Sequence, residues 1–365
     1  MSFLLLHLEF IIGLRGSWFG DYHSNLSNFT APHAGRQLRH DLGFLPALWA
    51  KDGDGVLVDY SERAEYSYKR FLQSVSRQLG KGCRLVKSPH WVQSVSPTEA
   101  AGIQPWGWDL ALKAQLKRTG ISDDLLPADE QIEAIRQLSH RRTSALILPQ
   151  LRFEGTVGES FECTSPEEVD GLLQRYDRLV LKAPWSSSGR GLRFIRRDAP
   201  VNQTGGWIRN LLHSQGSLMA EPFYDKVKDF GMEFECNSEG EVAYLGLSLF
   251  HTSNGAYTGN LLATETVKRE RISRYIPTDS LDIVSEKICL LMSSVLKGRY
   301  AGPFGVDMMV VRGTDGCLLH PCVEINLRRT MGHVALSLIP TDDDIVRVMQ
   351  IDYSDNSYHL RIIRP

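Results

Sequence analysis

Apolar and polar positions alternate with a period of two in a pair of segments near the end of the chain. GVDMMVV (305–311) and LLHPCVEIN (318–326) are both rich in apolar and β-branched residues, the composition of strands. RGTDGC between them contains an Asp-Gly pair, which marks a tight hairpin turn. Paired residue numbers in an antiparallel hairpin have a constant sum, and a turn centred near Asp315 sets that sum at about 630. The pattern therefore predicts that Asp307 lies opposite residue 323 or 324.

The first third of the chain alternates between short apolar runs and helical patterns. The runs at 56–60 and 83–89 have the composition of strands, and residues 66–79 between them have helical periodicity. Strands that alternate with helices are typical of a parallel sheet, so we expect residues 1 to about 125 to form a small α/β lobe. The apolar start is interpreted as a buried strand of this lobe rather than a signal peptide, because it has no basic segment and no small-residue cleavage site.

The remainder predicts helices and further strands. Helical periodicity runs through 130–151 and predicts one helix that joins two lobes. Ser165, Pro166 and Glu168 have the spacing of a capping box, so a helix is expected to begin there. We expect two more helices, at about 206–213 and 281–296. Strands are expected on both sides of the 186–191 loop, and at 217–223, 229–236 and 241–252.

Size and charge limit the kinds of ligand. A chain of 365 residues usually contains more than one core. Its net charge of -2 gives no electrostatic basis for binding nucleic acid or an anionic membrane. The six cysteines form no CxxC pair, which indicates a reduced, cytoplasmic protein. We therefore expect small-molecule ligands, with neither nucleic acid nor membrane as a partner, and leave a homodimer open.

Three oxygen-bearing side chains meet on one face of the predicted hairpin. Glu324 and Asn326 are two residues apart, so they point to the same side of their strand, and Asp307 faces them from the other strand. Two carboxylates and one amide oxygen suit Mg²⁺, or alternatively Mn²⁺. A solvated strand face would explain any one of these residues, but it does not predict that they share a register. The group is therefore interpreted as a metal site that serves a nucleotide.

A small-residue loop, SSSGRG (186–191), lies between two predicted strands and offers hydroxyls and main-chain N–H groups to phosphate oxygens. Lys182 ends the preceding strand and could neutralise the same phosphates. No helix follows at once, which argues against a dinucleotide-binding fingerprint, and a simple hairpin turn is the alternative. The candidate phosphate contacts in the loop are Ser187, Ser188, Gly189 and Gly191.

These motifs occur in a recognisable order. Lys182 with its glycine loop comes first, Glu221-Pro222 after a short strand comes next, and Asp307 with Glu324-x-Asn326-x-Arg328 comes last. In this order the chain resembles the ATP-grasp superfamily, over about residues 130 to 335. The resemblance implies a mixed fold, α/β with an α+β C-terminal part. It places a pre-ATP-grasp lobe at 1–128 and the ATP-grasp domain at 129–352, with subdomains 129–216 and 217–352 that hold ATP between them.

The resemblance also implies roles in nucleotide binding. Lys182 and a second basic residue would bind the α and β phosphates, and the second residue is Arg141, with Arg142 as a competing choice. A hinge at Met219 to Pro222 would bind adenine, with Glu221 near its amino group. Asp229 would bind the ribose. The metal ligands implied are Asp307, Glu324 and Asn326.

The resemblance further implies an ATP- and Mg²⁺-dependent ligase. It would join a carboxylate to an amine through an acyl phosphate and release ADP and phosphate. Arg328 would steady the charge on the acyl phosphate, and Lys182 the charge on the transferred phosphoryl group. A phosphotransferase and a non-catalytic nucleotide-binding protein are the alternatives.

Two departures and one loop bear on the substrate. Gly305 stands where the D-alanine-D-alanine ligases have an arginine, and Leu327 to Gly332 replaces their Pro-Gly segment. That particular chemistry is therefore not expected. The loop at 251–260 lies where the family has a variable substrate loop, in which His251, Asn254 and Tyr257 are candidate contacts. His333 either faces the site or caps the next helix.

Overall fold

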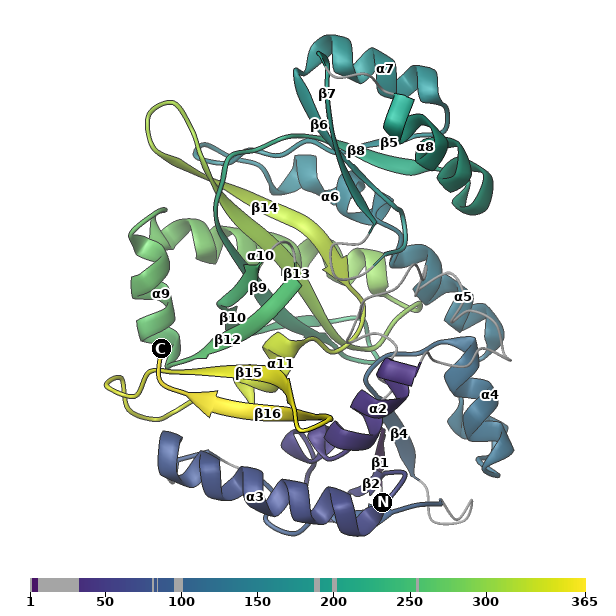
Figure 1. The fold of residues 1–365 in the computed structure, drawn as a ribbon, viewed down its shortest axis with the longest axis vertical. Coiled ribbons are helices and arrows are strands. Elements are labelled where there is room, and N and C mark those ends of the chain that lie inside the picture. Colours follow the sequence, from purple (N-terminus) through teal and green to yellow (C-terminus); the bar gives the residue numbers. More distant parts are fainter. Residues whose placement is uncertain are drawn as a thin grey trace.

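Four four-stranded sheets are arranged along the long axis of the molecule (Figure 1). The structure is a computed structural model, and it describes residues 2–5, 33–80, 82–83, 85–94, 101–186, 191–198, 202–253 and 256–365. One sheet is parallel and belongs to the first lobe, whereas the other three are antiparallel. The predicted fold class, α/β with an α+β C-terminal part, is therefore confirmed.

The first lobe is built on the parallel sheet, in the order β3-β2-β1-β4. The run at 83–89 was expected to be a strand, but its described residues are not in the sheet, and β3 follows at 90–92. The carbonyl of Val86 accepts a hydrogen bond of 2.7 Å from the Tyr68 hydroxyl, so a side chain takes the place of a ladder partner. The elements of this lobe are β1 (Ser2–Leu5), α2 (His33–Leu42), η2 (Leu45–Leu48), β2 (Gly55–Leu57), α3 (Ser61–Leu79), β3 (His90–Val92), β4 (Gly102–Pro105), α4 (Leu110–Arg118) and η3 (Asp123–Leu125).

Two helices connect the first lobe to the rest, where the sequence pattern predicted one. α5 (Asp129–Leu138) ends and α6 (Arg142–Leu151) begins on either side of a short break. The Ser139 hydroxyl bonds back to the carbonyl of Ile135 at 2.8 Å, and the His140 ring accepts from the N–H of Arg142 at 2.9 Å. The carbonyl of Ile135 still accepts from the N–H of Ser139 at 2.9 Å, but the His140 ring takes the N–H of Arg142 that a continuous helix would have paired.

The second sheet has the order β5-β8-β6-β7 and is covered by two helices. α7 (Pro166–Arg175) begins as predicted, because Ser165 accepts a hydrogen bond from the N–H of Glu168. β8 lies between β5 and β6, so this subdomain extends to Pro222, beyond the boundary expected at residue 216. The other elements are β5 (Phe161–Cys163), β6 (Arg178–Lys182), β7 (Leu192–Arg196), α8 (Asn202–Gln215) and β8 (Leu218–Pro222).

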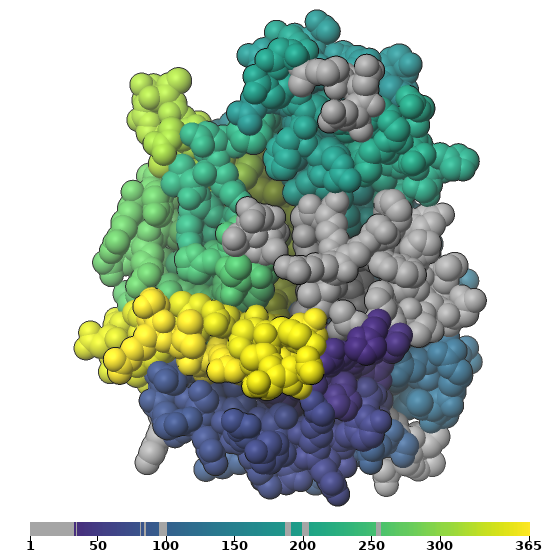
Figure 2. Space-filling model, in the orientation of Figure 1, coloured from purple at the N-terminus to yellow at the C-terminus, as the bar shows by residue number. Residues whose placement is uncertain are grey.

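The last two sheets form the centre of the molecule and its junction with the first lobe. β10-β9-β13-β14 is backed by α6 and α10, and β11-β12-β15-β16 carries the C-terminal hairpin. Met349, Leu360 and Ile362 of that hairpin share a core with Leu38 and Tyr68, and the two segments lie against each other in Figure 2. The elements are β9 (Lys226–Cys236), β10 (Val242–Ser248), β11 (Phe250–Ser253), β12 (Ala256–Leu262), α9 (Glu265–Ser273), α10 (Thr278–Leu296), β13 (Gly302–Arg312), β14 (Cys317–Asn326), α11 (Met331–Leu336), β15 (Arg347–Ser354) and β16 (Ser357–Ile363).

Two features of the structure concern the redox state of the cysteines and the membrane-spanning potential of the helices. All six cysteines are free thiols. Among the described residues, no helix combines the length and the apolar composition that a membrane span requires.

A substitution at Phe304 would test how much the packing of the central sheet contributes to the stability of the protein. Its ring is fully buried and stacks on Phe234 at a centroid distance of 5.2 Å. Replacing Phe304 by Ala should lower the free energy of unfolding by about 3–5 kcal/mol, because the removed ring leaves a cavity. Urea denaturation measures the change.

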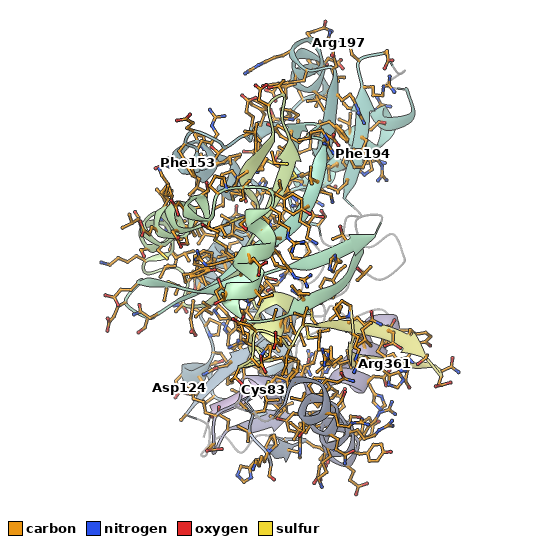
Figure 3. The ribbon with its side chains drawn as sticks, turned by 90° about the vertical axis from the view of Figure 1, so that its left-hand side faces the viewer. Cys83, Asp124, Phe153, Phe194, Arg197 and Arg361 are labelled. Atoms are coloured by element: carbon orange, nitrogen blue, oxygen red, sulfur yellow. The ribbon has the colours of Figure 1, made fainter. Side chains whose placement is uncertain are left out.

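Phe194 provides the control for this measurement. It lies on β7 in the upper part of the molecule (Figure 3), and 64% of it is exposed. Phe194→Ala should change the free energy of unfolding by less than about 0.5 kcal/mol. Equal losses in the two variants would contradict the assignment of the core.

Candidate nucleotide and metal site

The β13–β14 hairpin brings the three predicted metal ligands together. Asp307 pairs directly with Glu324, and Gly305 pairs with Asn326, so the predicted register is confirmed. The amide of Asn326 donates a hydrogen bond of 3.2 Å to the carboxylate of Asp307. All three side chains therefore lie on one face of the sheet.

The register depends on a bulge that the sequence did not reveal. Between the Asp307–Glu324 and Met309–His320 pairs, one residue of β13 faces three of β14. Pro321 is one of the three and has no N–H to donate, which is typical of residues at a bulge. Beyond the bulge, the N–H of Ile325 donates to the Ser144 hydroxyl of α6 at 3.1 Å. α6 therefore holds β14 in place on the side of the metal face.

The charge on Asp307 is strongly disfavoured in the metal-free protein. Desolvation, with the neighbouring charges of Glu324 and Glu233, raises the pKa of Asp307 to about 7, against the opposing charge of Arg328. A bound cation would reverse this effect by compensating the carboxylates. The three ligands are thus arranged at the expense of stability, as is common where a site is built for a ligand.

Arg141 connects the metal face to the phosphate loop. Its Nη1 lies 2.6 Å from Glu324 Oε2, and its other nitrogens donate to the carbonyls of Ala183 and Ser186, both at 3.0 Å. Arg142, the competing choice, is more exposed and lies 3.6 Å from Glu162. Arg141 therefore contacts both the predicted metal ligand Glu324 and the start of the loop, whereas Arg142 contacts Glu162.

Lys182 occupies the predicted position at the end of β6. It is buried, and its Nζ lies 2.6 Å from Glu221 Oε2, which is buried as well. Breaking a buried pair of this kind leaves an uncompensated charge. Each ion therefore holds the other in place.

The phosphate loop begins at Ser186 and returns at Gly191, and these two ends nearly touch. A Cβ at Gly191 would overlap the Ser186 side chain and lie 2.9 Å from the Cβ of Ala183. The carbonyl of Gly191 accepts from the N–H of Ala183 at 2.8 Å. Glycine is therefore required at 191 so that the loop can close. Three predicted contacts lie outside the described residues: Ser187, Ser188 and Gly189.

The expected hinge is displaced along the chain. Met219 and Ala220 lie in the middle of β8, with ladder partners in β5 and β6, so their main-chain groups are already paired. Pro222 is buried at the end of the same strand. The connection between the subdomains is residues 223–225, where no strand is formed. The apolar pattern continued to Phe223 and gave no indication of where pairing stops.

Asp229 lies on the same face as Asp307, one row away, because it pairs with Met309. Its carboxylate contacts Lys226 Nζ at 2.5 Å and accepts from the Thr252 hydroxyl at 2.7 Å. His251 belongs to the candidate substrate loop, and its Nδ1 lies 3.2 Å from the Nζ of Lys228, which is on the same strand as Asp229. Asn254 lies outside the described residues. The Asp229 carboxylate is thus held by Lys226 and Thr252, and its role in binding ribose stays a prediction.

Glu233 is a member of the site that the sequence reading missed. It is buried and pairs with Gly305, on the face that carries Asp307. A Cβ at Gly305 would lie 2.6 Å from its carboxylate, so the glycine that departs from the D-alanine-D-alanine ligases makes room for Glu233. Residues 229, 231 and 233 are each two positions apart along the predicted strand, so they point to one face. This period of two could have identified Glu233 from the sequence.

His333 both caps a helix and faces the site. Its ring accepts from the N–H of Thr330 at 3.1 Å in the capping box of α11. The same Nδ1 lies 2.9 Å from Glu233 Oε2. Glu233 Oε2 is buried, and it makes no hydrogen bond in this close contact. The two alternatives left open by the sequence are therefore both realised.

The donor set fits Mg²⁺. Among the described residues, no group of three or more His, Cys, Asp and Glu side chains could hold a metal ion. Asp307 and Glu324 supply two carboxylates, and the Asn326 amide completes the set. Mg²⁺ usually takes one or two carboxylates from a protein and completes its shell with water and phosphate oxygens.

The similarity to known proteins lies in the structure rather than in the sequence. No family model and no curated protein matches the sequence. The solved structures that are similar include N5-carboxyaminoimidazole synthetase from Staphylococcus aureus, with 13% identity, a TM-score of 0.48, and coverage of 87% of this chain and 82% of that one. The biotin carboxylase domain of Hydrogenobacter thermophilus 2-oxoglutarate carboxylase, bound to MgADP and bicarbonate, has 14% identity, a TM-score of 0.48, and coverage of 71% and 60%.

Both structures are of the kind to which the sequence resemblance points. At these identities the similarity concerns the fold, so the roles of individual residues rest on the geometry described above. The antiparallel sheet with β6 and β7 flanks the predicted phosphate loop, and the sheet with β13 and β14 carries the predicted metal ligands.

Asp307→Asn should stabilise the metal-free protein at high pH. An unfolded Asp ionises near pH 3.8, whereas folded Asp307 holds its proton to about pH 7. The free energy of unfolding therefore falls as the pH rises from 4 to 7, and the full penalty remains above 7. The uncharged variant should be more stable than the wild type by on the order of 2 kcal/mol at pH 8 and nearly equal at pH 4.5, measured by urea denaturation.

Two controls accompany this pH experiment. Asp315→Asn, in the exposed turn of the same hairpin, should change the free energy of unfolding at pH 8 by less than about 0.5 kcal/mol. Adding Mg²⁺ at pH 8 should stabilise the wild type and have less effect on Asp307→Asn. An Asp307→Asn protein that is less stable than the wild type at pH 8 would contradict the assignment of the raised pKa.

Proposed function

We propose that this protein is an ATP- and Mg²⁺-dependent ligase that joins a carboxylic acid to an amine through an acyl phosphate. The observation that carries the proposal is the position of Arg328. It lines the same cavity as Glu324 and Asn326, and its charge acts on Asp307. A guanidinium group there can stabilise charge that develops on a carboxylate as it is phosphorylated.

Each group in the site has a task in this reaction. Lys182 and Arg141, both buried, would offset negative charge on the nucleotide phosphates. Mg²⁺ held by Asp307, Glu324 and Asn326 would neutralise phosphate oxygens and orient them. An oxygen of the substrate carboxylate takes the γ-phosphoryl group and ADP leaves. The amine nitrogen then attacks the acyl carbon, and phosphate leaves with the bonding pair.

The proposed reaction requires no nucleophile from the protein. Phosphoryl transfer depends mainly on orientation and charge stabilisation. Two subdomains that meet at Arg141 can provide both, because this side chain contacts the start of the phosphate loop and Glu324 at once. The metal face and the loop would therefore close on the phosphates as one unit.

The proposal predicts trapping of an acyl phosphate by hydroxylamine. With ATP, Mg²⁺, hydroxylamine and a pool of carboxylic acids, the wild type should form both ADP and hydroxamate, measured by chromatography and iron complexation. Glu324→Gln and Arg328→Ala should each lower kcat by about 10²-fold or more, because groups that stabilise the transition state have effects of this size.

Lys182→Ala should cause a similar loss of activity, and Lys268→Ala is its matched control. Lys268 is also buried and paired, with Nζ 3.1 Å from Glu265 Oε2, but it lies outside the proposed machinery. It should lose stability and retain kcat. ADP without hydroxamate would indicate a phosphotransferase instead, and nucleotide binding without ADP formation would indicate a binding protein.

A further inference from the structure

A second cavity, of about 200 Å³, lies where the first lobe meets the central sheet. The end of β4 lines it from the first lobe, and the start of β13 and the end of β9 line it from the central sheet. One water molecule needs only about 10–15 Å³, so this volume can hold a small organic molecule. Trp108 lines both this cavity and the one that Arg328 lines, so the two cavities adjoin.

Arg329 is the basic residue of the second cavity. Its guanidinium lies 4.6 Å from the centre of the Trp49 ring, and its main-chain N–H donates to the carbonyl of Trp106 at 2.7 Å. Its Nε is buried and makes no hydrogen bond to any described residue. The indole N–H groups of Trp49 and Trp106 are donors as well, and they too find no acceptor in the described part of the chain. The immediate surroundings of Arg329 therefore supply donors without acceptors.

The charge of Arg329 lacks a complement. Across the ranges that the structure describes, no carboxylate forms an ion pair with it. Desolvation lowers the pKa of Arg329 to about 10, whereas a charge removed from water is normally paired or bound to acceptors. The face of the Trp49 ring attracts the cation but leaves its N–H groups unsatisfied. An anionic group bound in the cavity would supply the missing complement.

Glu235 is the acidic residue of the same cavity. It is exposed on β9, where it pairs with Pro303. Residues two apart on a strand share a face, so Glu235 lies on the face of Glu233 and Asp307. Its charge acts on Arg329, yet the ion pairs among described residues include none that involves Glu235. The cavity therefore presents one cation and one anion that do not pair with each other.

We propose that this cavity binds an amino acid, with its carboxylate toward Arg329 and its amino group toward Glu235. A simple anion would meet the like charge of Glu235, and a simple amine would leave Arg329 without a complement, whereas a zwitterion satisfies both. Among the described residues that line the cavity, no other side chain is charged. The amino group lies toward the sheet that carries the metal face. The amino acid is thus the amine substrate, an assignment that rests on the proposed ligase function.

Calorimetric titration of the full chain without ATP tests the binding site. The standard protein amino acids and D-alanine identify the tightest binder, which is then compared with its analogues that lack one charged group. For alanine these analogues are propionate and ethylamine. The Kd of the amino acid should be at least about tenfold below that of either analogue, because each charge-assisted hydrogen bond is worth a factor of this size.

Two variants that each remove one charge separate the two contacts. Arg329→Gln should raise the Kd of the amino acid and of the acid analogue by at least about tenfold and leave that of the amine analogue unchanged. Glu235→Gln should affect the amino acid and the amine analogue instead. A general loss of structure would affect both analogues alike. Arg178→Gln is the matched control, because Arg178 also stacks on a ring, 3.6 Å from the centre of Phe223, but lies on β6 in the second sheet.

The outcomes decide this inference separately from the ligase function. An analogue that binds as tightly as the amino acid, an amino acid whose Kd neither variant changes, or no saturable binding of any amino acid would overturn the site. Amino-acid binding without hydroxamate formation would keep the site and exclude the ligase, and hydroxamate formation without amino-acid binding would do the reverse. If both occur, the amino acid should replace hydroxylamine and yield an amide, detected by mass spectrometry. Absence of the amide would overturn the assignment as amine substrate.

Discussion

The pairing of Asp307 with Glu324 across β13 and β14 is the constraint on which the rest of the site depends. It places two carboxylates side by side on a sheet face that already carries Glu233. A shift of one residue in either strand would turn one carboxylate to the other face. Several contacts oppose such a shift, among them the bond from Ile325 to Ser144 of α6 and the closed packing of Glu233 against Gly305 and Gly332. The glycines are therefore part of the metal site although they bind nothing.

Two ion pairs, one of them fully buried, hold the basic side chains of the candidate site in place. Arg141 with Glu324, and Lys182 with Glu221, are each 2.6 Å apart. Such pairs contribute little net stability, because desolvation of both ions offsets their attraction. Their value here is positional, since each keeps a cation beside the place where phosphate would bind. If a nucleotide binds, one of its phosphates would replace a carboxylate as the partner of the cation. The free energy of desolvating the cation is then already included in the stability of the folded protein.

The sequence predicted the site better than it predicted the connections. Turn position predicted that Asp307 faces residue 323 or 324, but the observed pair with Glu324 also depends on the bulge between Asp307 and Met309, which the sequence did not reveal. The Ser165 capping pattern located the start of α7, because capping depends on local geometry. The break at His140 was missed because the apolar period continues through it while the His140 ring takes the N–H of Arg142. The hinge was assigned to Met219 because a pattern of apolar residues cannot reveal that β8 has a partner on both sides. The contact between Glu233 and His333 joins distant segments, and no local pattern contains it.

The central claim is that the hairpin face is a metal site for a nucleotide, and a crystal structure with Mn²⁺ and a non-hydrolysable ATP analogue tests it most directly. Anomalous scattering locates Mn²⁺ without reference to the fold. The account predicts the strongest peak between Asp307, Glu324 and Asn326, with phosphate oxygens of the analogue completing the coordination and Lys182 beside them. A strongest peak elsewhere, or an analogue bound away from β13 and β14, would contradict it.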